Sequence, residues 1–386
     1  MGASLPSQVG PNRQSMTISL TDYFDSNIGR LGEGQENKRG LVKSDIRLTP
    51  ALDVDVLRRI GQHQVGVQAS VGYDFYVRNT VLNSERFLVA PSAYLNLPVC
   101  DVSASGQVSR RQSDLGELIF QGIDPTLDSK NIQTTEAVRG QLICGGARGL
   151  RPIFEVGHST GRNSNPVRFD SNYKTTYYQP SLAFATPALG QLSVFARKTD
   201  TDLPDQRNLP GAATGYELHG YGVGYERAIG RNLNFRGSFS RVSVMPRGGT
   251  EGRRSGTNYD AAVTLQLGEQ LQLTGIASRQ FTSALTSDAA YELDQSYGLT
   301  ANYAVNRQLR FRFGGDISPR RLFYSNVQTL PRITEQTLRS AFAGASYDFG
   351  RRMRLNVQGG YTERTTDIPT FNYKAFNTLV GLAIDF

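Results

Sequence analysis

The feature that most constrains the fold is an alternation of apolar and polar side chains with a period of two residues. In the last segment, apolar residues occupy nearly every second position from Phe376 to Phe386, and the positions between them are mostly small or polar. Residues 64–75 repeat the pattern, with Val65 and Phe75 at the two ends of the apolar set. Successive side chains of a β-strand point to opposite faces, so each segment is predicted to be a strand with one apolar face.

The connections between these segments alternate strictly between two kinds. Eight are tight turns and nine are mostly longer polar stretches, which predicts 18 strands of about 10–14 residues. The tight turns are Arg58–His63, Leu97–Cys100, Cys144–Gly149, Pro187–Gly190, Ala228–Arg231, Leu267–Glu269, Val305–Arg307 and Phe349–Arg351. The longer connections are Ser26–Gly40, Asn79–Ser84, Asp114–Asn131, Thr160–Asn172, Asp200–Thr214, Arg247–Arg254, Thr286–Ala290, Arg320–Glu335 and Thr365–Thr370.

Composition excludes two other classes of protein. Charged residues make up 20% of the 386 residues and the mean hydropathy is −0.38, so no window supplies the roughly 20 apolar residues of a membrane-spanning helix. The net charge of +8 is spread along the whole chain, whereas a nucleic-acid binder more often concentrates it in a patch or tail. With 40 glycines and 37 tyrosines and phenylalanines, the composition favours β structure.

Together these patterns predict an all-β fold, a transmembrane antiparallel up-and-down β-barrel with short periplasmic turns and long extracellular loops. A soluble sandwich also alternates, but it has no reason to sort its loops by length. We expect residues 1–14 to be a short periplasmic segment and 15–386 to be a single barrel in the outer membrane of a Gram-negative bacterium. The first residues lack a basic and then apolar leader, so we expect a mature chain.

Polar residues of the alternating segments are expected to line an aqueous lumen, which a barrel of 16–18 strands leaves open. An arginine in the middle of the lipid face would cost about 2–4 kcal/mol, which favours the inward placement. Arginine outnumbers acidic residues in the later strands. Because an excess of positive charge raises the local concentration of anions, this pattern favours anionic cargo. The predicted pore-lining residues are Asp45, Arg47, Asp53, Arg86, Tyr94, Arg111, Arg139, Glu155, Arg197, Glu226, Arg236, Arg310, Arg312 and Arg354.

Two segments do not follow the alternation cleanly. Ile276 falls on the polar side of its segment, and in Thr337–Phe349 either parity is arguable. For the latter we choose Ala343 and Tyr347 as lipid-facing. A register error of one residue there would exchange the faces. Because the chain has no Trp, tyrosines and phenylalanines such as Tyr178 and Tyr221 are expected to form the belts at the membrane interfaces.

The two cysteines are predicted to form a disulfide. Cys100 and Cys144 both fall at tight turns, and a hairpin centred near 123–124 brings them opposite each other on the oxidising periplasmic side. The three histidines lie on separate segments and no metal, phosphate-loop or nucleophile motif is present. We therefore expect no metal, no cofactor and no enzymatic activity.

The amino-terminal third resembles the outer-membrane β-barrel proteins of exopolysaccharide biosynthesis operons, the "Putative beta-barrel porin 2" family. The resemblance is carried by residues 21–28 (TDYFDSNI), 44–50 (SDIRLTP), 66–79 and 105–111 (SGQVSRR), together with the terminal strand. It implies a passive outer-membrane channel through which a capsule or exopolysaccharide leaves the cell, working with a periplasmic polysaccharide-export protein. Inward aromatics such as Tyr76, Tyr94 and Tyr177 are candidates to stack on sugars.

Two alternatives stay open: a general or anion-preferring diffusion porin, and a surface adhesin or structural barrel. A porin commonly folds one long loop inward, and Ser26–Gly40, Asp114–Asn131 and Arg320–Glu335 are the candidates. Membrane lipid and the barrel-assembly machinery are further expected partners. The alternating set Val380, Leu382, Ile384 and Phe386 is the predicted carboxy-terminal assembly signal.

Overall fold

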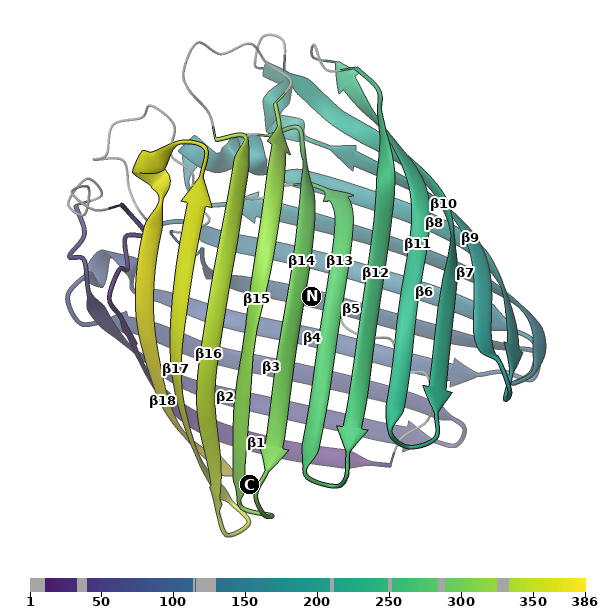
Figure 1. Ribbon diagram of the computed structural model, residues 1–386, viewed down its shortest axis with the longest axis horizontal. Helices are drawn as coiled ribbons and strands as arrows, with labels where there is room; N and C mark the ends of the chain where they lie inside the picture. The colour runs from purple at the N-terminus through teal and green to yellow at the C-terminus, as the bar shows by residue number, and fades with distance from the viewer. Residues whose placement is uncertain are drawn as a thin grey trace.

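The chain is a closed β-barrel. The computed structural model describes residues 11–32, 40–113, 115, 130–208, 212–248, 252–283, 289–324 and 333–386. These residues form eighteen strands, each paired antiparallel with its neighbours in sequence, and the first strand pairs with the last (Figure 1). The expected fold class is confirmed.

The strands hold 12 to 17 residues each. They are β1 (Arg13–Asp25), β2 (Asp45–Ile60), β3 (His63–Tyr76), β4 (Ser84–Asn96), β5 (Cys100–Gln112), β6 (Ile132–Cys144), β7 (Gly149–Asn163), β8 (Tyr173–Thr186), β9 (Gly190–Asp202), β10 (Ala213–Ile229), β11 (Leu233–Gly248), β12 (Arg254–Leu267), β13 (Leu271–Thr282), β14 (Tyr291–Ala304), β15 (Leu309–Phe323), β16 (Glu335–Phe349), β17 (Met353–Thr366) and β18 (Tyr373–Asp385). Short 3₁₀ helices follow β3, β7, β9 and β17, at Thr80–Leu82, Pro166–Ser171, Pro204–Asn208 and Pro369–Phe371.

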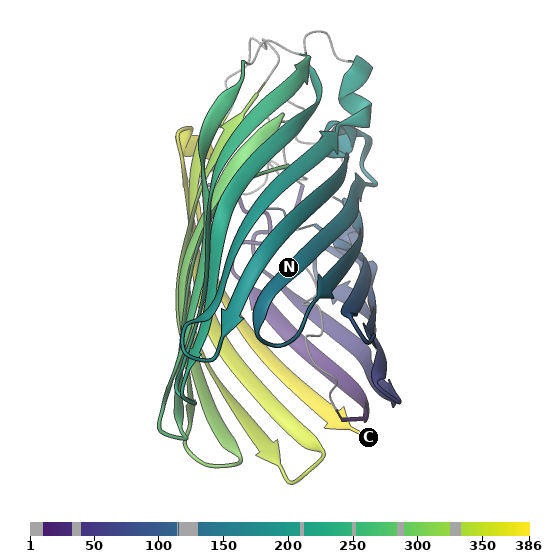
Figure 2. The same ribbon diagram turned by 90° about the vertical axis from the view of Figure 1, so that its right-hand side faces the viewer.

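The connections are sorted by length between the two ends of the barrel. All eight short turns lie at one end, and the longer connections lie at the other, as the tilted strands of Figure 2 show. Several short turns place a glycine at positive φ, as at Gly61 (φ 63°) and Gly230 (φ 62°), where a side chain would be strained. β1 begins at Arg13, two residues before the expected boundary, and residues 1–10 of the expected periplasmic segment lie outside the described part of the chain.

The outward face of the barrel is apolar and uncovered. Val71, Leu192 and Leu299 are more than half exposed, and the cross-strand partners of the first two on the same face are Phe87 and Phe184. An apolar surface of this extent needs lipid rather than water around it. The barrel is therefore a transmembrane barrel of the outer-membrane type. Within the described residues, no helix combines the length and apolar character needed to cross a bilayer.

The register settles the two irregular segments. Ala343 and Tyr347 of β16 lie opposite Phe313 and Leu309 of β15, so the parity chosen for 337–349 is confirmed. Ile276 of β13 pairs with Gly298 and Ala262, which face the lumen. Its side chain is therefore on the polar side, as the sequence indicated.

The described flanks of two long connections pack on the inner wall at the outer end. Leu41, Leu82 and Leu115 form a buried cluster with Tyr76, an inward-facing residue of β3. Leu115 belongs to the connection after β5, and Leu41 belongs to the connection after β1. The central parts of all three candidate inward loops (33–39, 114 and 116–129, and 325–332) lie outside the described residues.

The glycine run of β10 permits close approach of its neighbour β11. Gly220, Gly222 and Gly224 face the lumen, and a β-carbon on Gly222 would overlap the carbonyl oxygen of Phe239. The run is therefore a packing feature of the wall, which agrees with its position inside an alternating strand.

Substituting Gly222 tests this packing. We expect Gly222→Ala to lower the free energy of unfolding by about 1–3 kcal/mol, because backbone atoms of Phe239 and Ser240 would have to move. Gly275→Ala in β13 is the matched control, since no atom lies within 4 Å of the added carbon. Denaturant titration of both variants in detergent micelles measures the difference, and equal stabilities would contradict the packing argument.

Cys100 and Cys144 form a disulfide at the short-turn end of the barrel. They are register partners on β5 and β6, with their Cα atoms 4.0 Å apart and a sequence separation of 44.

Removing this bond should affect stability without affecting the pore. A loop of 44 residues corresponds to about 4 kcal/mol of unfolded-state entropy in the chain-entropy view, an upper bound here because the hairpin also holds the loop. We expect Cys100→Ser/Cys144→Ser to unfold at lower denaturant concentration than the wild type, with unchanged single-channel conductance. A reducing agent should reproduce the shift in the wild type and leave the double variant unaltered.

Candidate functional site

The candidate site is the polar inner wall. All fourteen residues predicted to line the pore occupy positions that the register places on the inward face, opposite the exposed apolar residues. Their contact with a permeating solute stays a prediction. The structure shows which of these side chains contact one another, and the contacts form three groups.

The first group surrounds Glu155 of β7. This carboxylate is only 7% exposed and pairs with the Arg139 guanidinium of β6. It also accepts hydrogen bonds from the Tyr177 hydroxyl at 2.7 Å and from the Gln141 amide at 3.4 Å. A carboxylate so enclosed needs these partners because burying an unpaired charge is costly. Its charge is therefore already neutralised from within the wall.

Arg197 of β9 completes this group without a carboxylate of its own. Its guanidinium lies 4.2 Å from the centre of the Tyr177 ring, and its Nε donates to the Thr199 hydroxyl at 3.4 Å. Tyr177 leans across Gly157, where a β-carbon would overlap the ring. The glycine thus makes room for the tyrosine, and the tyrosine in turn supports the arginine.

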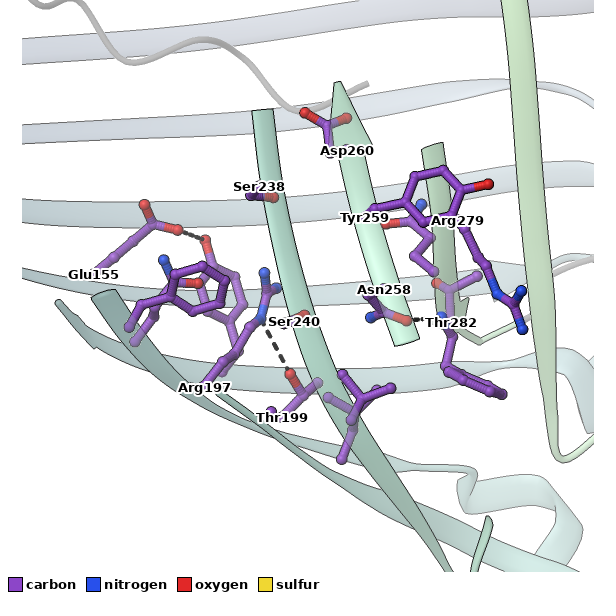
Figure 3. A pocket seen from close by; sticks show the side chains of 18 of the residues that line it. Glu155, Arg197, Thr199, Ser238, Ser240, Asn258, Tyr259, Asp260, Arg279 and Thr282 are labelled. Atoms are coloured by element: carbon purple, nitrogen blue, oxygen red, sulfur yellow. Dashed lines mark hydrogen bonds between the residues drawn. The ribbon is translucent and has the colours of Figure 1, made fainter. Parts of the chain in front are cut away.

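These residues line a cavity of about 680 Å³ on the inner wall, formed by β6 to β13. Figure 3 shows Glu155 and Arg197 on one side of it and Asp260 on β12 on the other. Its inward-facing charges are Arg139, Arg197 and Arg236 against Glu155 and Asp260. Arg279 of β13 also borders it, but its register partner Tyr259 places it on the outward face, so it is not counted among the inward charges. The cavity carries a surplus of positive charge.

A second group lies at the outer end, around β1 to β5. Asp74 of β3 accepts a hydrogen bond from the Thr49 hydroxyl at 2.6 Å and has Arg47 and Arg86 at 3.8 and 4.0 Å. Nearby, the fully buried Asp25 makes a two-pronged ion pair with Arg30, with nitrogen–oxygen distances of 2.8 and 2.7 Å.

These two aspartates belong to one cavity of about 300 Å³. Its lining also includes Arg111, which has no carboxylate within ion-pair distance among the described residues. With four arginines against two carboxylates, this cavity too has a positive surplus.

The third group lies near the short turns on β15 to β18. Asp348 pairs with Arg310 and, at 2.9 Å, with Arg354, whose second nitrogen is 3.7 Å from Asp385. Arg312 instead stacks on Phe342 at 5.2 Å. Two of the three arginines are therefore paired with aspartates, and Arg312 is the member of this group without a carboxylate partner among the described residues.

Three of these aspartates, Asp25, Asp74 and Asp348, were missed as site residues by sequence reasoning. Asp74 occupies an inward position of a clear alternation, so a signal was present, but its two arginines come from different strands. Asp348 lies in the segment whose parity was ambiguous.

The inward tyrosines are less accessible than a sugar-stacking role needs. Tyr76 and Tyr94 are 8% and 7% exposed, and the ring of Tyr177 is occupied by Arg197. In the described part of the chain, no three histidine, cysteine, aspartate or glutamate side chains gather as they would around a metal ion.

Comparison with known proteins gives a partial family match. Residues 250–386, which hold β12 to β18, match the model of the family described as "Putative beta-barrel porin 2". The match lies in the carboxy-terminal third rather than in the amino-terminal residues that carry most of the resemblance. No curated protein sequence matches the chain significantly.

The solved structures that align over nearly the whole chain are distant in sequence. The outer membrane protein OpdK from Pseudomonas aeruginosa aligns with a TM-score of 0.49 and 9% identity, covering 97% of this chain and 99% of that one. A BenF-like porin from Pseudomonas fluorescens Pf-5 gives 0.47 and 11%, with 97% and 99% covered. OccAB3 from Acinetobacter baumannii gives 0.46 and 12%, also with 97% and 99% covered. Such likenesses say nothing about the solute of this chain.

Removing the buried carboxylate tests the first group. We expect Glu155→Ala to lower the free energy of unfolding by about 1–2 kcal/mol, because Arg139 and Tyr177 lose their shared acceptor. Asp53→Ala is the control, since this inward carboxylate of β2 has no hydrogen bond or ion pair among the described residues. Denaturant unfolding measures both, and an equal loss in the control would show that Glu155 is an ordinary solvated wall residue.

Proposed function

We propose that the protein is a passive diffusion channel of the outer membrane that favours small anionic solutes. The observation that carries the proposal is which of the inward charged side chains have a partner of opposite charge. Glu155, Asp74 and Asp348 are each held by arginine, whereas Arg197 and Arg111 face the two cavities without a carboxylate partner among the described residues. Anions entering the lumen would meet the uncompensated guanidiniums.

The physical basis is electrostatic focusing in a narrow aqueous passage. A cleft lined by an excess of one charge raises the local concentration of oppositely charged solutes. Guanidinium groups also bind carboxylates in a planar, two-pronged geometry, which favours solutes bearing that group. Several weak sites along the wall suit conduction better than one tight site, because the solute must also leave.

The alternative function is export of a polysaccharide together with a periplasmic partner. The side chains of the inner wall support this function less well. The three inward tyrosines that were candidates for sugar stacking are enclosed or occupied by Arg197. The partial family match names a porin and no cargo. Deleting the gene separates the two functions: loss of surface polysaccharide with unchanged solute uptake would replace our proposal by export.

Charge removal inside the lumen is the direct test. We expect Arg111→Gln/Arg197→Gln to lower the anion-to-cation permeability ratio about twofold, measured as a reversal potential across a planar bilayer in a salt gradient. The effect should shrink at 1 M salt, where screening is strong. The matched control is Arg227→Gln/Arg339→Gln, which removes two positive charges from the outward face. Equal ratios in all three proteins would overturn the anion preference.

A further inference from the structure

The outward face of β8 to β11 changes character at its outer end. Tyr178 and Tyr221 are 49% and 68% exposed and end the apolar band on this side of the barrel. Their cross-strand partners on the same face are Lys198 for Tyr178 and Arg241 for Tyr221. Aromatic rings followed by cations mark the level at which hydrocarbon gives way to lipid headgroups.

Four basic side chains from neighbouring segments gather here, and we call them the outer basic patch: Lys198, His219, Arg241 and Arg253. Lys198 and His219 are direct register partners on β9 and β10. His219 in turn pairs with Ser243 of β11, whose hydroxyl accepts a hydrogen bond from Arg253 Nε at 2.7 Å. The patch therefore lies across adjoining positions of the wall.

The patch has more positive charge than its own surroundings cancel. Glu217 lies 3.4 Å from the Lys198 ammonium and 3.3 Å from the His219 ring, and it compensates one charge. Asp200, the next carboxylate on β9, is bound by Arg247 at 3.0 Å. Arg241 is exposed and has no carboxylate within ion-pair distance among the described residues. Arg241 and Arg253 therefore remain available to an external anion.

The patch lines an outward groove of about 410 Å³ with two unlike ends. Toward the middle of the membrane the lining is Pro180, Ala196 and the Tyr221 ring, and toward the outer end it is basic. The groove is thus apolar where acyl chains lie and cationic where headgroups lie. An amphiphile with an anionic head would match both ends in the orientation that it already has in the leaflet.

We propose that this groove binds the phosphorylated headgroup of an outer-leaflet lipid. Guanidinium and ammonium side chains form charge-assisted hydrogen bonds with phosphate, and clusters of them at a membrane surface bind phosphorylated headgroups. An outward arginine elsewhere on the barrel differs from those of the outer basic patch. Arg339 of β16 has Ile317 and Glu363 as its register partners, so no other basic side chain lies directly beside it on these two strands. The inference is independent of the proposed channel, because these side chains face lipid and not the lumen.

Native mass spectrometry of the detergent-purified protein tests the assignment. The probe is diphosphoryl lipid A, compared with the same lipid after removal of its phosphates. We expect the wild type to bind the phosphorylated lipid at least about tenfold more tightly than the dephosphorylated one, and Lys198→Gln/Arg241→Gln to lose about tenfold in affinity. Arg339→Gln, which removes an arginine at the same end of another strand, should bind as the wild type does. All variants should keep wild-type conductance.

Three results would overturn the proposal. Equal binding of the two lipids would show that the phosphate is not recognised, and undiminished binding by the double variant would place the lipid elsewhere. Competition by millimolar inorganic phosphate that removes the lipid would assign the patch to free phosphate instead. Because conductance is recorded on the same proteins, failure of lipid binding is distinguishable from failure of the channel proposal.

Discussion

Closure of the sheet is the constraint on which everything else depends. A strand edge in hydrocarbon would leave its amide and carbonyl groups without partners, at a cost of several kcal/mol for each group. Here nine residue pairs join β1 to β18, from Thr17–Asp385 to Asp25–Asn377, and the amide of Phe386 extends the seam by donating to Met16. The inward Thr17 hydroxyl also bonds the Asp385 carboxylate at 2.6 Å. The seam is thus held by backbone and side chain together.

Closure also decides the electrostatics of the inner wall. Once every strand has two neighbours, charges distant in sequence become partners: Arg139 meets Glu155 across one ladder, and Asp348 meets both Arg310 and Arg354 across two. Most inward carboxylates in the three groups are satisfied within the wall itself. A solute in the lumen would meet the arginines that have no carboxylate partner, chiefly Arg197 and Arg111. Our channel proposal rests on these arginines.

The same strands carry a second, separate set of charges on their outer side. Arg197 and Lys198 are consecutive residues of β9, yet one faces the lumen and the other faces the lipid. A period of two residues thus lets one strand serve an aqueous passage and a headgroup site without either perturbing the other directly. The proposed selectivity of the passage and the proposed lipid contact are therefore separable by mutation.

The amino-acid sequence by itself determined the number of strands, the pairing of Cys100 with Cys144 and the face of the residues in every strand with a clear alternation, whereas the parity of 337–349 needed the register. Those properties follow from the local alternation and from the spacing of the turns, so they can be inferred without knowing any long-range contact. Only the tertiary structure decided that Asp74 lies between Arg47 and Arg86, or that Arg197 covers Tyr177. The physical reason is that sliding one strand by two residues keeps every face unchanged but replaces every cross-strand partner. Alternation encodes the faces, and the partners are set by the register that closure of the whole barrel imposes.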